Sequence, residues 1–465
     1  HASNIILSAA TSEEEEEKRP HIVILGGGFG GLNTAITLST LPFDIKPRIT
    51  LIDKKDRFVF LPLLYELCVN DASLGEVAPT YTDLLKDVSV EFLCAELQGI
   101  DVQNNKVHTT QKEVMEYDAL IVATGAEIDL KSVKGADEFA LPFYTVDDCL
   151  ELKKRLALFD QYHTAAQKPV NVAVVGGGYS GVELALNLSE RLGGGGGGDD
   201  DNDSCTVTIV HRGKEVLEYA TDYNRKIGTD RLKKAGVNVM TQCSVTEITP
   251  SDNKNSSPLD QYKCQIQIQN QENDASSNAI PADLLLWTAG ATPPNPNKGI
   301  RNSLLPRDTN GRIVTGPLLR AKGLSNVFAL GDCSRAKQIP YAATAQVAMQ
   351  QAPVVAWNTY ATLTNSRKEN EEGDGKEKIK LLPFSYADLG EMMTLGSDDA
   401  TISSLGGLFT LSGESASVLR RLIYAVRMPT VQQGLVAVLD GTERRVKRKS
   451  SSTGGTGVRK VIGWK

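Results

Sequence analysis

Two glycine-rich segments of one pattern constrain the fold of this chain most strongly. Residues 26–31 read GGGFGG and residues 176–181 read GGGYSG, so both satisfy G-x-G-x-x-G, and each stands between an apolar run and a helix-like stretch. Glycine at these positions lets the chain turn sharply and approach a pyrophosphate, which then lies at the N-terminus of the helix. Two such copies predict two dinucleotide-binding domains. The residues expected to contact the nucleotides are Gly26, Gly28, Phe29, Gly30, Gly31, Gly176, Gly178, Tyr179, Ser180 and Gly181.

The residue that ends the next apolar run differs between the two copies. Asp53, followed by Lys54, stands twenty-two residues after Gly31, where a carboxylate can accept hydrogen bonds from ribose hydroxyls. The second copy has His211 and Arg212 at this place instead of an acid. Because an arginine can pair with a 2′-phosphate, we predict that NADPH is accepted at least as well as NADH. The alternative is that these two residues only end a strand.

Short β-branched runs alternate with helix-like stretches along the chain. Several runs are apolar on consecutive residues, which is typical of a parallel sheet covered by helices on both faces. The fold class is therefore predicted to be α/β with two Rossmann-like domains. The strands are expected at 21–25, 49–53, 119–123, 170–175, 206–210, 282–288 and 326–330.

Charge and cysteine content exclude several classes of protein. The net charge is −7, which argues against a nucleic-acid-binding protein, although the residues from Ser415 onward carry an excess of basic side chains. Seven cysteines form no C-x-x-C pair, so we expect free thiols in a reducing compartment and no metal site. No apolar run reaches the roughly 18 residues that a membrane-spanning helix requires.

Further motifs resemble the two-dinucleotide-binding-domain flavoproteins, the group of glutathione reductase-like enzymes. They are Ala123-Thr124-Gly125, Val327-Phe328-Ala329-Leu330-Gly331-Asp332 and Trp287-Thr288-Ala289-Gly290-Ala291. The resemblance implies that the first fingerprint holds FAD non-covalently and that the second holds NADPH or NADH. It also implies that Asp332 faces the ribityl chain of the flavin, and that Thr124, Gly125, Gly331 and Gly290 line the cofactor sites.

Within that group the chain resembles the type II NAD(P)H:quinone dehydrogenases, which do not pump protons. The similarity lies in the segment FVFLPLLY at 58–65, in Glu183, and in AQVAMQQ at 345–351; RMPT at 427–430 is similar to the plastid and cyanobacterial C-type branch. The resemblance implies transfer of two electrons from NAD(P)H through flavin to a membrane quinone, either plastoquinone-like or a naphthoquinone. It further implies a peripheral membrane protein of the plastid, with the mitochondrial inner membrane as the alternative.

These expectations divide the chain into five parts. Residues 1–19 contain a glutamate run and begin with histidine, which suggests a disordered leader left by a trimmed targeting peptide. The polar inserts at 193–203 and 364–378 are expected to be solvated loops. The predicted domains are 20–165 and 282–380 for FAD, 166–281 for NAD(P)H, and 381–465 for membrane association or dimerisation.

Three residues are predicted to take part in the reaction itself. Glu183 lies two residues after Gly181 at the start of a helix, and we expect it to position the nicotinamide and relay protons; the alternative is that it only binds amides of its own helix. Gln346 and Gln350 are four residues apart, so on a helix their amides share one face and can donate to a quinone carbonyl. The alternative is that Gln346 binds flavin or backbone and Gln350 is a surface residue.

Other chemistries fit the residues less well. A dithiol–disulfide reductase needs two cysteines near the flavin, and Cys68 stands alone after Asp53. A sulfide:quinone oxidoreductase needs Cys149 and Cys333 to converge, although neither lies in a recognisable motif. A redox-sensing flavoprotein scaffold with little turnover, or a reductase of a soluble ferredoxin-like protein, remain alternatives.

The C-terminal region has the pattern of an amphipathic helix. Leu419, Leu422, Ile423 and Val426 form one stripe, with Arg420 and Arg427 off it, and a basic cluster follows at 444–449. An apolar stripe and a basic cluster together favour binding to an anionic membrane surface. The alternative is packing against the body of the protein or a second subunit, as in a homodimer.

Overall fold

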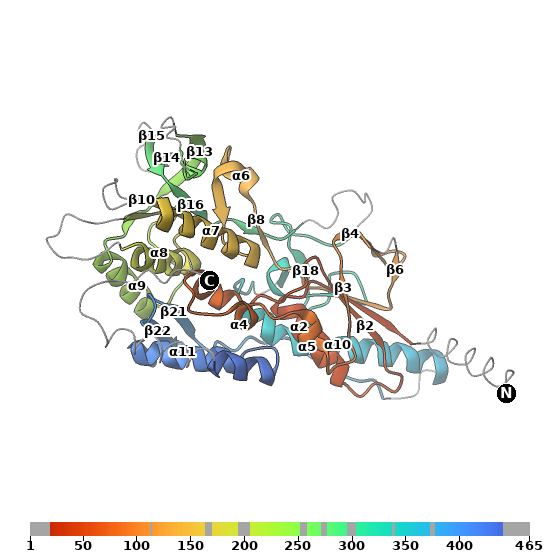
Figure 1. The fold of residues 1–465 in the computed structure, drawn as a ribbon. Coiled ribbons are helices and arrows are strands. Elements are labelled where there is room, and N and C mark those ends of the chain that lie inside the picture. The colour runs from red at the N-terminus through yellow and green to blue at the C-terminus, as the bar shows by residue number, and fades with distance from the viewer. Residues whose placement is uncertain are drawn as a thin grey trace, which may run out of the picture. The chain divides into compact units, whose positions relative to one another are not determined.

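The chain forms two compact units in the computed structural model (Figure 1), which describes residues 19–111, 114–162, 170–193, 205–251, 258–270, 277–294, 304–336, 340–372 and 377–439. The first unit takes in residues up to Phe58 and the ranges Thr80–Asp129 and Gly290–Ala387. The second comprises Val59–Pro79, Leu130–Ala289 and the residues from Asp388 onward. Neither unit is a continuous stretch of chain.

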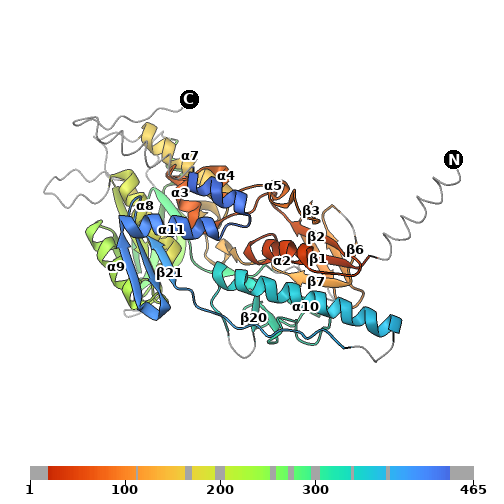
Figure 2. The same ribbon diagram turned by 90° about the horizontal axis from the view of Figure 1, so that it is seen from below.

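A parallel five-stranded sheet forms the centre of the first unit. Its order is β19-β7-β1-β2-β3, with β1 His21–Leu25, β2 Arg48–Asp53, β3 Glu91–Cys94, β7 Ala119–Val122 and β19 Val327–Ala329. The central strands are buried on consecutive residues, as the unbroken apolar runs predict. Helices α2 (Phe29–Thr40) and α10 (Ala345–Glu372) pack against each other, and they lie side by side in Figure 2.

A small antiparallel sheet completes the core of the first unit. It contains β4 (Leu97–Asp101), β5 (Lys106–Thr109) and β6 (Met115–Glu116), whose buried side chains share one cluster with those of the parallel sheet. The remaining elements are short: α5 Tyr81–Leu85, β8 Glu127–Ile128, β17 Ala291–Thr292, β18 Ile313–Thr315 and β20 Ser334–Ala336.

Helix α10 extends further than expected. The solvated loop predicted from 364 is wrong as far as Glu372, because the helix continues through these residues. Lysine, arginine and glutamate are good helix formers, so a charged stretch that follows a helix can prolong it. The last four residues before 377 lie outside the described residues.

A second parallel five-stranded sheet forms the centre of the second unit. Its order is β12-β11-β10-β16-β9, with β9 Ala140–Pro142, β10 Val170–Val175, β11 Cys205–Val210, β12 Asn238–Met240 and β16 Leu284–Trp287. Three helices accompany it: α7 Val146–Tyr162, α8 Tyr179–Leu192 and α9 Asp222–Lys234. An antiparallel sheet of β13 (Cys243–Pro250), β14 (Cys264–Asn270) and β15 (Ser277–Ala282) and the short helix α6 (Ala136–Phe139) belong to the same unit.

The C-terminal part of the second unit is a three-stranded meander followed by a helix. The strands are β21 Glu391–Thr394, β22 Ala400–Ser404 and β23 Phe409–Gly413, and α11 (Glu414–Val426) packs on them (Figure 2). Residues 431–439 are also helical. Two short helices, α3 (Leu64–Cys68) and α4 (Leu74–Val77), lie in the segment that joins this unit from the N-terminal half.

The predicted α/β class with two parallel sheets is confirmed, with small shifts at the strand ends. The units divide the chain at 129 and 289 rather than at the predicted 165 and 281, and residues 59–79 join the second unit. The predicted leader as far as Lys18, residues 194–203 of the predicted insert and the basic cluster at 444–449 lie outside the described residues. In the part that is described, no helix has both the length and the apolar character needed to cross a membrane.

Candidate functional site

The first fingerprint forms an open turn at the N-terminus of α2. Gly26 has a φ of 94°, and a Cβ on Gly31 would meet the Gly26 carbonyl oxygen at 1.8 Å, so both positions require glycine. A Cβ on Gly28 would meet nothing within 4 Å, and no side chain caps the helix that begins at Phe29. This space next to uncapped helix amides fits the pyrophosphate of a dinucleotide.

Asp53 holds the turn of the first fingerprint from the end of β2. Its Oδ2 accepts a hydrogen bond of 2.7 Å from the Gly27 amide, and Oδ1 accepts one from Lys55. Burial raises the pKa of this carboxyl above its usual value. Lys54 is exposed and pairs with Glu127. A half-buried carboxylate beside the glycine turn fits the ribose of the adenosine half.

Gly331 and Asp332 lie just after the carboxyl end of β19 in the parallel sheet of the same unit. Gly331 has a φ of 69°, and its amide donates a 2.7 Å hydrogen bond to Oε1 of Gln351 on α10. Asp332 follows in a short 3₁₀ turn, and burial raises the pKa of its carboxyl. The sequence prediction missed Gln351, which is 4% exposed. Thr124 and Gly125 follow β7, which is the neighbour of β19 in the sheet. Gly290 is exposed and is the first residue of the range 290–387 that belongs to the first unit.

The second fingerprint repeats this turn at the N-terminus of α8. A Cβ on Gly181 would meet the Gly176 carbonyl oxygen at 1.9 Å, and one on Gly178 would meet nothing within 4 Å. Ser180 is exposed, whereas the hydroxyl of Tyr179 donates a 2.6 Å hydrogen bond to Glu391 on β21. Tyr179 thus fixes the fingerprint to the C-terminal meander of its own unit, a contact that the sequence prediction did not foresee.

His211 occupies the place in the second fingerprint that Asp53 occupies in the first. Its Nδ1 accepts a 3.1 Å hydrogen bond from the Gly177 amide, the counterpart of the Gly27 amide. Burial lowers the pKa of the imidazole, so the ring is neutral and Nδ1 can act as the acceptor. Arg212 is exposed beside it. The site therefore has no carboxylate at this position and has a cation next to it.

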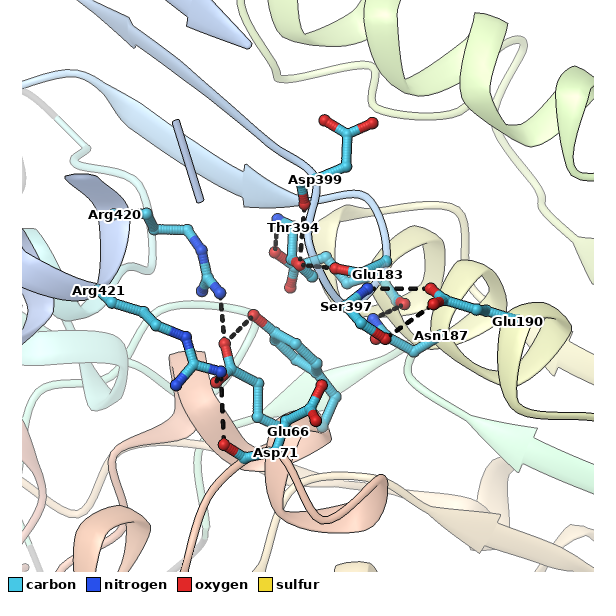
Figure 3. A network of polar contacts seen from close by, with 12 residues as sticks. Glu66, Asp71, Glu183, Asn187, Glu190, Thr394, Ser397, Asp399, Arg420 and Arg421 are labelled. Carbon is cyan, nitrogen blue, oxygen red and sulfur yellow. Dashed lines mark hydrogen bonds and ion pairs between the residues drawn. The ribbon is translucent and has the colours of Figure 1, made fainter. Parts of the chain in front are cut away.

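Glu183 is held by a strand rather than by its own helix. Its Oε1 accepts a 2.9 Å hydrogen bond from the Thr394 amide at the end of β21 (Figure 3). Desolvation by the surrounding protein raises the pKa of this carboxyl to about 7, against the opposing effects of the Thr394 hydrogen bond and the Arg420 charge. A group with this pKa can both hold and release a proton near neutrality.

A buried ion network lies close enough to Glu183 to affect its charge. Glu66 on α3 pairs with both Arg420 and Arg421 on α11, and Glu66 and Arg420 are 3% and 2% exposed (Figure 3). The Tyr65 hydroxyl also donates to Glu66, at 3.2 Å. Two arginines on one carboxylate leave an excess of positive charge in the interior. The sequence contained no local signal for this network, since its partners are more than 350 positions apart.

The apolar stripe predicted for α11 is divided in the structure, because Leu422 and Val426 are exposed whereas the other two members pack inward. Arg420 was placed on the polar side of an amphipathic helix, but it is buried, because Glu66 neutralises it there. Leu419 and Ile423 pack inward on Ala400, Ile402 and Ala416. The outer face instead carries a second apolar row, which continues along residues 431–439. Its members are Val418, Leu422, Val426, Val431, Leu435 and Leu439, all at least 40% exposed.

The two predicted quinone-site glutamines lie on α10, and both are bonded to the segment that precedes Asp388. The Gln350 amide both donates to and accepts from the Ala387 backbone, at 2.8 and 3.0 Å. The Gln346 Oε1 accepts a hydrogen bond from the Tyr386 hydroxyl at 3.1 Å. Their four-residue spacing places them on one face of α10, as predicted. From that face Gln350 binds the backbone of Ala387.

The thiols invoked for sulfide chemistry have other partners. Cys149 lies against Cys68 within the second unit, and Cys333 lies against the carbonyl oxygens of Val122 and Leu330 within the first. Cys68, which the sequence left alone, therefore does have a sulfur neighbour.

Comparison with known proteins agrees with this geometry. Residues 20–352 match the family described as pyridine nucleotide-disulphide oxidoreductase. The chain is 37% identical to the demethylphylloquinone reductase NdbB of Synechocystis sp., over 90% of this chain and 95% of the relative. It is 36% identical to the alternative NAD(P)H-ubiquinone oxidoreductase C1, chloroplastic/mitochondrial, of Arabidopsis thaliana, over 87% and 77%.

Relatives of lower sequence identity include a named type II NADH:quinone oxidoreductase and a solved structure of NDH2. The type II NADH:quinone oxidoreductase NdhA of Mycobacterium tuberculosis is 31% identical over 82% of this chain and 78% of its own. The solved structure of NDH2 from Plasmodium falciparum superposes with a TM-score of 0.74 at 18% identity, covering 92% of this chain and 98% of that one.

Proposed function

This chain belongs to the pyridine nucleotide-disulphide oxidoreductase family and, within it, to the type II NAD(P)H:quinone oxidoreductases, and from that membership we propose how its own residues divide the reaction. It is an FAD-dependent enzyme that passes two electrons from NAD(P)H to a quinone without pumping protons. The flavin supplies the redox chemistry when bound. The protein binds and orients the two nucleotides and supplies protons.

The residues of the two fingerprints fit the two nucleotides. The Gly26–Gly31 turn, Asp53, and the Gly331–Asp332 pair held by Gln351 hold FAD. The Gly176–Gly181 turn holds the nicotinamide nucleotide. The observation that supports this most strongly is the repeated geometry, in which a side chain at the end of the second strand accepts a hydrogen bond from the middle amide of each turn.

We propose that the second site accepts NADPH at least as well as NADH. A carboxylate in place of His211 would repel a 2′-phosphate, whereas the neutral imidazole does not, and the exposed Arg212 guanidinium can pair with the phosphate. NADH is also proposed as a substrate, since neither the imidazole nor Arg212 repels a ribose without a phosphate.

Glu183 is proposed to position the nicotinamide and to relay protons toward the quinone. The Thr394 amide fixes its carboxyl group, and its pKa of about 7 leaves both protonation states populated near neutrality. Within the neighbouring ion network, the Arg420 charge lowers the pKa of Glu183 and so favours release of the proton, whereas the Glu66 charge opposes it. Two-electron reduction of a quinone consumes two protons, and Glu183 is placed to pass a proton in this step.

The two glutamines are proposed to serve the quinone in different ways. The Gln346 side chain contacts the head group, with its carbonyl oxygen oriented by Tyr386. Gln350 fixes the Ala387 backbone and so keeps Tyr386 in place beside Gln346. An amide suits a quinone carbonyl, since it donates a hydrogen bond without bringing a charge into an apolar site.

We also propose that the outer apolar row of the C-terminal helices lies in a membrane surface. Its residues are exposed at intervals of four within each helix, and Leu405 and Leu408 are exposed in the same part of the chain. Burying each large apolar side chain contributes about 1.5–3 kcal/mol, and the basic cluster at 444–449 adds attraction to anionic lipids. A prenylated quinone stays in lipid, so the enzyme must reach it there. Association of two copies through this row is the alternative.

The plastid is proposed as the location, with the mitochondrial inner membrane as the alternative. The relatives from a cyanobacterium and from Arabidopsis thaliana support this choice, since the name of the latter gives both organelles. The quinone is proposed to be plastoquinone-like or a naphthoquinone, and the name of the cyanobacterial relative favours the second.

Stopped-flow spectroscopy of the flavin-loaded protein tests these proposals. Mixing with NADPH or NADH should bleach the flavin absorbance, and a second mixing with a short-chain naphthoquinone or benzoquinone should restore it in a single turnover. A redox-sensing scaffold would bleach but recover slowly. Bleaching by NADH at least ten times more efficient than by NADPH would reject the proposed nucleotide preference.

A further inference from the structure

Two cysteines that are far apart in the sequence meet in the interior of the second unit. Cys68 is the last residue of α3 and Cys149 lies in the first turn of α7. Their Sγ atoms are 2.9 Å apart, and the side chains are 5% and 0% exposed. The Cys149 thiol also lies 3.5 Å from the Leu64 carbonyl oxygen, so both thiols face the same small space between the helices.

The separation of the two sulfurs is close to that of a covalent bond. A disulfide has a sulfur–sulfur distance of about 2.05 Å, so an approach of roughly 0.9 Å joins them. Rotation of both side chains about χ1 can supply this approach, because α3 and α7 are already packed against each other. The folded positions of α3 and α7 are therefore compatible with the bond once it has formed.

We propose that Cys68 and Cys149 are a site of reversible oxidation, at which a disulfide links α3 to α7. Two thiols lose two protons and two electrons as the S–S bond forms. A small-molecule disulfide accepts them: a protein thiolate attacks it, one thiol leaves, and the second protein thiol displaces the other from the mixed disulfide. The products are the protein disulfide and two small thiols, so atoms and electrons balance.

Burial sets the rate of this reaction. Desolvation and the neighbouring Cys149 thiol raise the pKa of Cys68, so little thiolate is present at neutral pH. The oxidant reaches the pair only when the short helix α3 opens locally. Oxidation should therefore be slow at pH 7 and faster at pH 9, because only the thiolate attacks.

The disulfide would also fix the network that α3 shares with α11. Tyr65 and Glu66 lie on α3 three and two residues before Cys68, and Glu66 pairs with Arg420 and Arg421. A bond to α7 limits the opening of α3 and closes a chain loop of about eighty residues, which lowers the entropy of the unfolded state. Oxidised protein should unfold at a temperature about 5 °C or more above that of reduced protein.

Peptide mapping by mass spectrometry tests the proposal on the full chain with flavin bound. The protein is held in buffers of increasing oxidised-to-reduced glutathione ratio until no further change occurs. It is then denatured in the presence of N-ethylmaleimide, which alkylates the thiols that are still free. The expected result is one linked pair of peptides carrying Cys68 and Cys149, two mass units below their sum. Alkylation of both residues at the most oxidising ratio, or linkage of either to a different cysteine, would overturn the proposal.

Variants separate this bond from general effects of oxidation. In Cys149→Ala, oxidation should no longer raise the unfolding temperature, whereas Cys264→Ala removes another buried thiol of the same unit and should keep the full rise. If Cys149→Ala does not fold, the unfolding temperatures and peptide maps of the oxidised and reduced unaltered protein still test whether the disulfide forms. An equal rise in both variants would contradict the assignment.

Discussion

The Nδ1 atom of His211 accepts a hydrogen bond from the amide of Gly177 at 3.1 Å, in the place where the first fingerprint has the carboxylate of Asp53. The histidine therefore supports the glycine turn without bringing a negative charge to it. Such a substitution keeps the fold of a dinucleotide site while changing the charge that a ribose or its 2′-phosphate meets.

His211→Asp should change the nucleotide preference. The new carboxylate can accept both the Gly177 amide and the ribose hydroxyls, but it repels a 2′-phosphate. We expect the ratio of kcat/KM for NADPH over NADH to fall about tenfold or more. Steady-state kinetics with each nucleotide on the same preparation gives the ratio, and an unaltered ratio would show that this position does not select the nucleotide.

Glu183→Gln should slow quinone reduction and leave flavin binding intact. Glutamine can still accept from the Thr394 amide but cannot carry a proton. In the unaltered enzyme the protonated fraction of Glu183 falls as pH rises through about 7, so flavin reoxidation by quinone should slow above that pH. The variant should be slow and independent of pH over this range.

Glu190→Gln is the matched control on the same helix, since Glu190 binds Ser397 on the exposed side. It should keep both the rate and its pH dependence.

The raised pKa of Glu183 also affects stability. Folded protein binds this proton more tightly than unfolded protein, so the contribution of Glu183 to the free energy of unfolding is lost as pH rises from about 4.5 to 7, by at most about 3 kcal/mol. A pH profile of Glu183→Gln identical to that of the unaltered enzyme would remove Glu183 from the relay.

Gln346→Leu should raise the KM for quinone severalfold, because the head group loses a hydrogen-bonding partner, while bleaching of the flavin by NADPH keeps its rate. Gln351→Leu provides the contrast one turn along α10, since it leaves the Gly331 amide without its acceptor. That variant should lose flavin on dilution, measured by the fluorescence of released FAD. Equal quinone KM values for Gln346→Leu and the unaltered enzyme would reject the proposed contact.

Arg420→Met should destabilise the second unit by about 3–5 kcal/mol, since Glu66 stays buried with one of its two cations removed. Thermal unfolding measures this loss. Lys226→Met removes an exposed cation from α9 and should change the unfolding temperature little. The double variant Glu66→Gln with Arg420→Met should recover part of the loss, and its failure to do so would mean that the charge of Glu66 is not what the arginine compensates.

Leu422→Asp combined with Val426→Asp should weaken sedimentation with anionic liposomes at least tenfold, because both side chains belong to the outer apolar row. Tyr219→Asp changes an exposed residue away from that row and is the control. Deletion from Ser415 is a poorer test, since it also removes Arg420 and leaves Glu66 unpaired. Liposome binding that survives the double substitution would place the membrane contact elsewhere.

The sequence allowed prediction of those features that depend on neighbours along the chain. The two glycine turns, the parallel strands and the helical spacing of Gln346 and Gln350 all follow from short-range patterns. The hydrogen bond of His211 was not foreseen, but its position was, because discounting the polar insert at 193–203 brings the distance from Gly181 to the end of the next strand close to that from Gly31 to Asp53.

Features that depend on distant partners could not be predicted. The apolar spacing of α11 did not show which of its residues face inward: Leu419 and Ile423 do and Leu422 and Val426 do not, and the orientation depends on Glu66 accepting Arg420. Gln350 and Gln351 are neighbours on α10, and Gln351 is the one that binds the Gly331 amide. Predicting this contact would require knowing how α10 is positioned against the sheet. The Cys68–Cys149 pair likewise depends on how α3 meets α7.

The interleaving of the two units along the polypeptide has a consequence for biosynthesis. The second unit begins at Val59 and needs α11 before Glu66 has its partners, so nearly the whole message must be translated before that unit can close. A nascent chain emerging N-terminus first would expose the unpaired α3 carboxylate for most of its synthesis. Such an arrangement favours late closure of the second unit over domain-by-domain folding on the ribosome.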